Sequence, residues 1–262
     1  MTNLTNNQNE RKHIQQFLDH IFYFNCLLFK SLQITRTIGD SVILLNSRFD
    51  EVHFGKFASF YLRREYYFDV HPPFGKLVFA LAGYFIGYDG SFSFDKIGLD
   101  YIEQGVPYIA LRMVSVLSGT LIVPLCYLIL KERHFSHQST LFGTSLVLLD
   151  TALVTQTRFI LLDGLLLLFI VLACYSWTKF ERASSFKLFN KESCFWLALC
   201  GVSMTLATGV KMVGLLTVLL IGVLTIRRFW EMIDKAKNVP SVLEDNFRKL
   251  LEANLCTAHY FL

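Results

Sequence analysis

Charge is scarce in this sequence. Only 18% of the 262 residues are Asp, Glu, Lys or Arg, and 53% are hydrophobic, whereas soluble domains carry about 25% charged residues. The net charge of +4 is small, and the basic residues lie mainly at the ends of apolar blocks. This distribution is typical of topology determinants in a membrane protein, and it lacks the basic patch that nucleic-acid binding requires. We therefore expect a membrane protein with no nucleic-acid partner.

Two further signals are missing. None of the 6 cysteines belongs to a CxxC pair, and most of them lie in or beside apolar runs. We therefore expect neither a disulfide framework nor a zinc site. The polar stretch at residues 1–20 contains no apolar core and no small-residue cleavage site, so no cleaved signal peptide is expected.

The sequence does contain a series of long apolar runs separated by short polar turns. A helix needs about 20 mostly apolar residues to cross a bilayer, and the longest run is split in two at Gly209–Lys211. The expected fold is an all-α polytopic membrane protein with about six spans. A shorter run, opened by Pro72 and Pro73 and closed by Gly87, predicts an interfacial or re-entrant helix instead. The spans are expected within residues 14–38, 106–130, 141–155, 159–177 and 194–224.

Basic residues between the spans indicate the topology. Lys and Arg gather in four segments that fall on one side of the membrane, at residues 1–13, 131–133, 179–191 and 227–237. The positive-inside rule makes that side cytosolic and places the first long loop, 39–106, in the lumen or outside the cell.

Three regions follow from this topology. We expect a disordered cytosolic tail at residues 1–13 and a transmembrane domain at residues 14–230. Residues 231–262 are charged and amphipathic. We expect them to form a cytosolic tail that is cut off just before a further span.

The first long loop begins with a dense group of ionisable residues. The stretch from Arg48 to Lys76 carries the adjacent acids Asp50 and Glu51 and the histidines His53 and His71. Such groups are costly beside a membrane, which favours a chemical role. The alternatives are that both acids are solvated loop residues and that both histidines are structural. No spacing among these residues matches a known set of metal ligands, so no metal is expected.

Charged residues within the apolar runs allow two interpretations. Arg112 either binds a phosphate or pairs with one of the two loop acids and fixes the loop. Lys211, beside the expected turn, either meets a phosphate or extends its amine to the membrane surface. Asp150 and the pair Arg158 and Asp163 are expected to form ion pairs within the membrane that position helices.

Five segments resemble the dolichyl-phosphate-mannose protein O-mannosyltransferase family. They occur in order over about residues 36–230, and together they are far more specific than any one of them. The segments are F-D-E-V-H-F-G-K-F at 49–57, R-R-E-Y-Y-F-D-V-H-P-P-F-G-K at 63–76, L-A-G-Y-F-I-G-Y-D-G-S-F at 81–92, T-R-F-I-L-L-D-G at 157–164 and G-V-K-M-V-G-L at 209–215.

This resemblance implies a GT-C-type transmembrane bundle in the endoplasmic reticulum membrane, with interfacial helices in the lumenal loop. The activity implied is transfer of mannose from dolichyl-phosphate-mannose to Ser or Thr of Ser/Thr-rich acceptor proteins. It further implies no cofactor and no metal, and a heterodimer with another family member.

The resemblance also assigns roles to individual residues. The family's acidic pair falls on Asp50 and Glu51, with Asp50 as the expected general base and Glu51 as its partner or a group that positions the acceptor. Two family arginines fall on Arg36 and Arg112, and Arg36 is expected to form an ion pair within the membrane.

Two other functions were weighed. A non-catalytic partner subunit, or a relic of the family, would keep the helices that form dimers without the full donor pocket. A small transporter would need paired inverted halves, which the sequence does not show. The intact Asp50–Glu51 pair favours the enzyme.

Overall fold

The computed structural model describes residues 49–92, 94, 101, 106–184 and 190–237. The chain divides into two units, Met1–Thr217 and Val218–Leu262, and each is described by itself. All regular elements in the described ranges are helices. They are α3 (Phe49–Arg63), α4 (Phe74–Phe85), α5 (Tyr108–Glu132), α6 (His137–Leu148), α7 (Thr151–Gln156), α8 (Leu162–Ser184), α9 (Lys191–Val210), the short 3-10 helix η1 (Met212–Gly214) and α10 (Leu215–Lys237).

Four helical segments are long and apolar enough to cross a membrane: α5, α8, α9 and the segment Met212–Asp234, which contains most of α10. They match the runs predicted at 106–130 and 159–177 and the split run at 194–224. The predicted class, an all-α polytopic membrane protein, is confirmed. The run at 14–38 lies outside the described residues.

The run at 141–155 does not form one span, so that prediction is wrong. Helix α6 ends at Leu148, and α7 starts only at Thr151. Between them the carboxylate of Asp150 accepts a hydrogen bond of 3.0 Å from the backbone N–H of Leu153. This is an N-cap, which satisfies a donor that the first turn of a helix leaves free. Asp150 thus lies in the break between α6 and α7 and caps the start of α7. It does not form the ion pair expected for it within the described residues.

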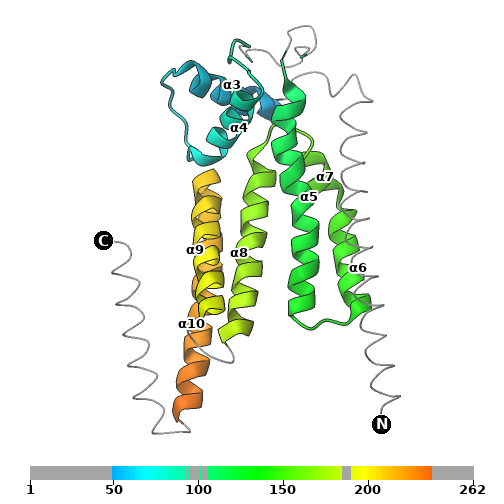
Figure 1. The fold of residues 1–262 in the computed structure, drawn as a ribbon, viewed down its shortest axis with the longest axis vertical. Helices are drawn as coiled ribbons and strands as arrows, with labels where there is room; N and C mark the ends of the chain where they lie inside the picture. Colours follow the sequence, from blue (N-terminus) through cyan, green and yellow to red (C-terminus); the bar gives the residue numbers. More distant parts are fainter. Residues whose placement is uncertain (1–48, 93, 95–100, 102–105, 185–189, 238–262) are drawn as a thin grey trace. The chain divides into compact units, whose positions relative to one another are not determined.

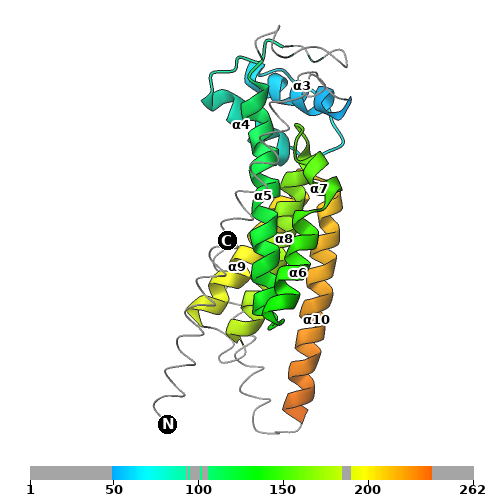
Figure 2. The same cartoon turned by 90° about the vertical axis from the view of Figure 1, so that its right-hand side faces the viewer.

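The first unit is a helix bundle with α8 at its centre. Helix α8 packs between α5 and α9, and α6 packs against the outer side of α5. Figures 1 and 2 show α3 and α4 at one end of α5, α8 and α9, where the chain enters α8 from α7. Helix α4 contacts α3, α5, α8 and α9. Helices α3 and α4 therefore cover one end of the apolar bundle.

The turn after α9 is as tight as the sequence predicts. Helix α9 ends at Val210, and Lys211 is extended before η1 begins. A Cβ atom on Gly214 would lie 2.4 Å from the carbonyl carbon of Ala207. Only glycine allows the returning chain to approach the end of α9 this closely.

Helix α4 is the short helix predicted after Pro72 and Pro73. It has 12 residues, Pro73 precedes its first turn, and the chain leaves it through Gly87 at a φ of +75°. One face is buried against the bundle and includes Lys76 and Phe79, while the other exposes apolar side chains such as Leu81.

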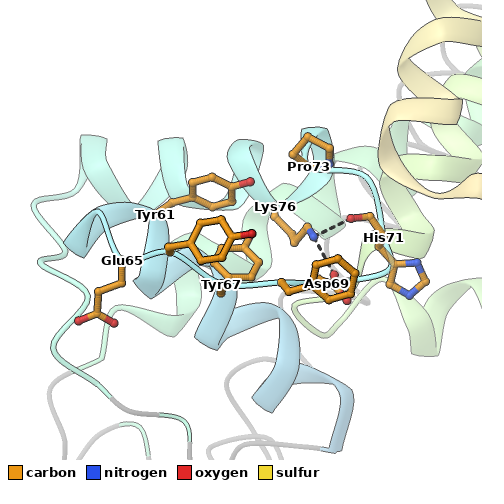
Figure 3. A pocket seen from close by; sticks show the side chains of 9 residues that line it. Tyr61, Glu65, Tyr67, Asp69, His71, Pro73 and Lys76 are labelled. Carbon is orange, nitrogen blue, oxygen red and sulfur yellow. Dashed lines mark hydrogen bonds and ion pairs between the residues drawn. The ribbon is translucent and has the colours of Figure 1, made fainter.

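The link from α3 to α4 turns back along α3 and is held by a buried lysine. The Nζ atom of Lys76 lies 2.7 Å from a carboxylate oxygen of Asp69 and 2.8 Å from the backbone oxygen of His71 (Figure 3). The same ammonium lies 5.0 Å from the ring centroid of Phe57 and 5.4 Å from that of Tyr67. One cation thus joins the start of α4, the link and α3.

Candidate functional site

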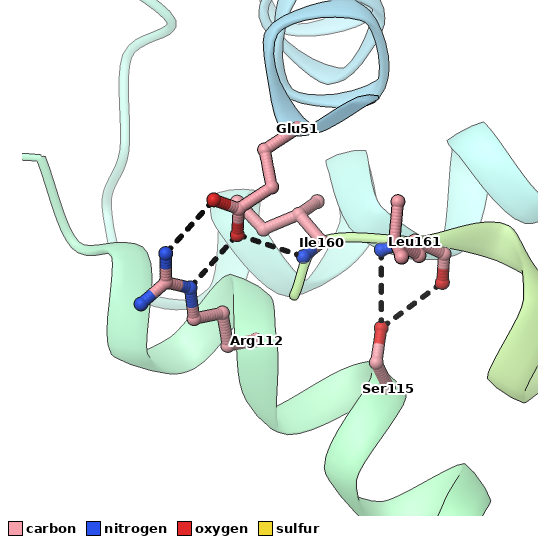
Figure 4. A network of polar contacts seen from close by, with 5 residues as sticks. All are labelled: Glu51, Arg112, Ser115, Ile160 and Leu161. Carbon is pink, nitrogen blue, oxygen red and sulfur yellow. Dashed lines mark hydrogen bonds and ion pairs between the residues drawn. The ribbon is translucent and has the colours of Figure 1, made fainter. Parts of the chain in front are cut away.

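Glu51 is held at the centre of a buried polar network where α3 meets the bundle (Figure 4). Its two carboxylate oxygens accept hydrogen bonds of 2.8 Å each from Nε and Nη2 of Arg112 on α5. One of these oxygens also accepts a 2.9 Å bond from the backbone N–H of Ile160, just before α8. The side chains of Glu51 and Arg112 are both 0% exposed. A two-bond arginine–carboxylate pair fixes direction as well as distance, so this network sets the position of α3.

Aromatic rings surround the Arg112 guanidinium. Its carbon lies 5.2 Å from the ring centroid of Tyr108, 5.4 Å from that of Tyr101 and 5.6 Å from that of Phe159. Ring faces attract a cation that has left water. Burial, and then the negative charge of Glu51, raise the pKa of Tyr101, so this phenol stays neutral beside the ion pair.

The loop before α8 is fixed at a second point by α5. The hydroxyl of Ser115 donates to the backbone oxygen of Leu161 at 3.0 Å and accepts from the N–H of the same residue at 3.4 Å. Glu51 holds the neighbouring residue, Ile160, so two side chains from different helices hold two consecutive residues of this loop. The sequence analysis missed Ser115; its only signal is a hydroxyl one turn beyond Arg112.

Asp50 differs sharply from its neighbour Glu51. It lies in the first turn of α3 and is exposed. Its carboxylate forms no hydrogen bond or ion pair with any residue in the described part of the chain. The adjacent acids are thus divided: Glu51 positions the helix, while Asp50 remains open to a ligand.

Lys211 and Asp163 form a second ion pair at the same end of the bundle. Their Nζ and Oδ1 atoms are 2.7 Å apart, with side-chain exposures of 17% and 33%. The expected pairing of Asp163 with Arg158 is not formed, because Asp163 faces Lys211 at the end of α9. The Nε atom of Arg158 is buried without a hydrogen-bond partner among the described residues.

The two predicted histidines lie on α3 and next to it. His53 is exposed on α3, and His71 is half-buried with its ring 6.3 Å from the ring of Phe54. The structure therefore brings His71 to the same helix as Asp50. Arg36 lies outside the described residues.

A pocket of about 330 Å³ opens beside the α3–α4 link. Figure 3 shows Tyr61, Tyr67 and Glu65 at one end and His71 at the other, with Lys76 and Asp69 between them. Burial works to raise the pKa of Asp69, but the hydrogen bond and the charge of Lys76 outweigh it and lower the pKa. Asp69 is therefore a permanent anion at neutral pH. The sequence analysis assigned no role to Lys76 or Asp69, although a lysine in an apolar helix was a signal.

No metal site is evident where the structure gives coordinates. Among the described residues, no group of three or more His, Cys, Asp or Glu side chains could hold a metal ion. The absence of a metal from the reaction stays a prediction.

Comparison with known proteins identifies the family. The model of the dolichyl-phosphate-mannose-protein mannosyltransferase family matches residues 41–257. Dolichyl-phosphate-mannose--protein mannosyltransferase 4 of Candida albicans is 46% identical over 191 residues, which cover 73% of this chain and 25% of that protein. Human protein O-mannosyl-transferase 1 is 40% identical over 187 residues, covering 71% of this chain and 25% of the human protein.

A solved structure agrees with these relatives. The S. cerevisiae protein O-mannosyltransferase Pmt1-Pmt2 complex bound to the sugar donor contains a chain with a TM-score of 0.74 and 32% identity. The match covers 82% of this chain and 28% of that chain. This protein therefore spans about a quarter of the length of the curated relatives it matches. With a family model that matches most of its residues, the chain belongs to the dolichyl-phosphate-mannose-protein mannosyltransferase family.

Proposed function

We propose that this chain takes part in protein O-mannosylation, transferring mannose from dolichyl-phosphate-mannose to Ser or Thr hydroxyls of acceptor proteins in the endoplasmic reticulum lumen. Family membership supports the reaction. A sugar donor is bound in the solved relative, which is a complex of two family members. We accordingly infer a heterodimer with another family member. The resemblance implies no cofactor, and none is included in the proposal.

Asp50 is the general base of the proposed reaction. The acceptor hydroxyl oxygen attacks the anomeric carbon of mannose and its proton passes to the Asp50 carboxylate. The bond from that carbon to the phosphate oxygen breaks, and its electron pair leaves with dolichyl phosphate. The carboxylate must be free to receive a proton and close to the bundle.

One observation carries this proposal: the division of labour between Asp50 and Glu51. Arg112 and the Ile160 amide occupy Glu51. These contacts fix the first turn of α3, so the exposed carboxylate of Asp50 projects from a rigid segment of backbone. A positioned base contributes more to rate than a mobile one. In this scheme Arg112 acts through Glu51. This is the second of the two interpretations given for Arg112, pairing with a loop acid, and not phosphate binding.

Lys211 is the best placed cation for the donor phosphate. An ammonium has three donors, and Asp163 accepts from it at 2.7 Å. The remaining donors can serve phosphate oxygens at the same end of the bundle. His53 and His71 are proposed to contact substrate beside Asp50.

The direct test is Asp50→Asn. It keeps size and removes the base, so we expect mannosyl transfer to fall by about a hundredfold or more. Microsomes from cells expressing the whole chain together with a second family member would be given labelled dolichyl-phosphate-mannose and an acceptor peptide. Peptide labelling above the background of non-expressing cells is the measurement.

The matched control is Glu231→Gln, a neutralised acid outside the proposed site whose side chain is 41% exposed and pairs with Arg227. It should retain transfer within about twofold, because exposed pairs contribute little. Undiminished transfer by Asp50→Asn, at equal protein level, would refute the assignment of the base.

Orientation is tested with two single substitutions that create glycosylation sequons. Asp89→Asn gives N-G-S at residues 89–91, and His134→Asn gives N-F-S at residues 134–136. Asp89 and His134 are both exposed. With the α3–α4 region in the lumen and residues 131–133 in the cytosol, only the first variant should gain a glycan in microsomes, seen as a shift removed by endoglycosidase. A glycan on the second alone would reverse the topology.

A further inference from the structure

The link between α3 and α4 exposes an unusual row of apolar side chains. Tyr66, Phe68 and Val70 are 95%, 83% and 74% exposed. The intervening Tyr67 and Asp69 turn inward and are partly buried. Side chains that alternate in this way are typical of an extended strand, and Figure 3 shows the link running almost straight from Glu65 to His71.

Most backbone N–H groups of this link have no hydrogen-bond partner among the described residues. The N–H groups of residues 66–69 form no hydrogen bond with the described residues, although those of Arg64 and Glu65 bond back to α3. The N–H of Val70 is bonded only to the side chain of Asp69. An extended segment with free donors and acceptors is a template for pairing with another extended chain.

The link leads toward Asp50. Along α3, positions 50, 54, 57 and 61 lie on one face, because they follow helical spacing. The ring of Tyr67 stacks on Phe57 at 4.7 Å, and its edge meets Tyr61 at 5.4 Å. Farther along, the ring of His71 lies 6.3 Å from that of Phe54, one turn from Asp50. The link therefore runs antiparallel to the face of α3 that begins with the proposed base.

Charges around the link are already neutralised. Glu65 pairs with Arg63 at 3.0 Å, and Asp69 pairs with Lys76 at 2.7 Å. A surface whose acids and bases are largely paired is complementary to an uncharged ligand, and it offers little attraction to an acidic lipid surface. Insertion into lipid is also disfavoured, because the unpaired backbone groups would lose water without gaining partners.

We propose that residues 65–70 bind the acceptor polypeptide as an added strand. The acceptor is an extended, uncharged segment rich in Ser and Thr. Its backbone pairs with residues 66–69, and its side chains pack on Tyr66, Phe68 and the adjacent pocket. This binding mode, strand addition to a free edge, directs the acceptor hydroxyl toward Asp50. The inference rests on the proposed function for the identity of the ligand.

Photo-crosslinking tests binding without requiring catalysis. The photoreactive residue p-benzoylphenylalanine replaces Phe68 in the whole chain, in microsomes that also hold a second family member. The probe is a labelled Ser/Thr-rich peptide of about 12 residues without proline, long enough to span the link when extended. Replacement of Tyr84 provides the matched control, since this aromatic on α4 is 70% exposed but lies outside the link. We expect a saturable peptide adduct at position 68 and none at position 84.

Backbone pairing is tested by competition. The same peptide carrying N-methyl groups on alternate residues cannot donate from those amides. We expect it to compete about tenfold less well than the unmodified peptide, because several hydrogen bonds are lost. Equal competition would overturn strand pairing. Adducts at position 68 with lipid only, with the chain itself or its partner only, or no adduct at all would overturn the proposal.

Kinetics separate this inference from the proposed function. The double variant Tyr66→Ser/Phe68→Ser should raise the KM for the acceptor peptide about tenfold, with kcat and the KM for the donor unchanged. The Asp50→Asn variant should still form the adduct at position 68 while losing transfer. Adduct formation by a wild-type chain that transfers no mannose would refute the proposed function and leave peptide binding intact. Transfer with an unchanged acceptor KM in the double variant would refute the docking site.

Discussion

The two ends of the α5–α8 pair use charge in opposite ways. At the end near α3, Glu51 and Arg112 are both 0% exposed. At the other end, Glu132 bonds to Lys179 at 3.1 Å and to Arg182 at 2.7 Å, with the Arg182 side chain 55% exposed. The first pair must carry the full cost of leaving water, whereas the second group is partly hydrated through Arg182, with Lys179 and Glu132 only 19% and 14% exposed.

That difference indicates what each end is for. A buried ion pair is seldom more stable than apolar side chains of the same size. The Glu51–Arg112 pair is therefore better explained by geometry, since it joins α3, α5 and the loop before α8 at fixed angles. The hydrated group around Glu132 joins the ends of two parallel helices and positions no loop that carries a candidate site residue.

The largest effect should follow from Glu51→Gln. The substitution keeps the shape but leaves Arg112 as a buried cation without its counter-charge, which costs about 3–5 kcal/mol. We expect the apparent Tm of the chain in detergent to fall by about 10 °C, with loss of mannosyl transfer. Heating followed by size-exclusion chromatography of the remaining folded protein provides the measurement.

Two variants show whether the effect arises from the ion pair. Asp50→Asn, one residue away and exposed, should leave the apparent Tm unchanged. Arg112→Lys keeps the charge but loses the planar guanidinium that binds both carboxylate oxygens. Its apparent Tm should therefore lie between those of the wild type and Glu51→Gln. A drop in Tm for Asp50→Asn that equals the drop for Glu51→Gln would contradict the division between the two acids.

The sequence predicts the long helices well. Apolar length predicts α5, α8 and the run at 194–224, and the glycines around Lys211 predict where that run is split. Both signals are local, so they can be read without knowing how the helices pack. Three of the five family segments, at 49–57, 157–164 and 209–215, meet at one end of the bundle. The prediction of one span at 141–155 was wrong. The sequence alone does not distinguish an aspartate that is charged within a span from one that caps a helix, and the backbone conformation at Asp150 shows that it is a cap.

The choice of partners within the site could not be predicted. Asp50 and Glu51 are adjacent, so on a helix they point about 100° apart, and sequence alone cannot say which one faces Arg112. Asp163 was expected to pair with Arg158, but the geometry at the end of α9 pairs it with Lys211. Pairings such as Glu51 with Arg112 join residues 61 positions apart, and they are settled by how α3 and α4 pack on the bundle.

The smallest effect should follow from Glu132→Gln, which applies the same chemical change to the hydrated end. Here Arg182, whose side chain is 55% exposed, can turn to water, so the loss in free energy of unfolding should be only about 1 kcal/mol. We expect the apparent Tm to change by no more than about 3 °C, with transfer retained. The wild-type advantage should shrink further at high salt, because exposed pairs are screened.

A loss as large as that of Glu51→Gln would mean that exposure does not separate the two ends. A small loss, with transfer retained, would support the buried pair as the one that positions Asp50 for the proposed transfer.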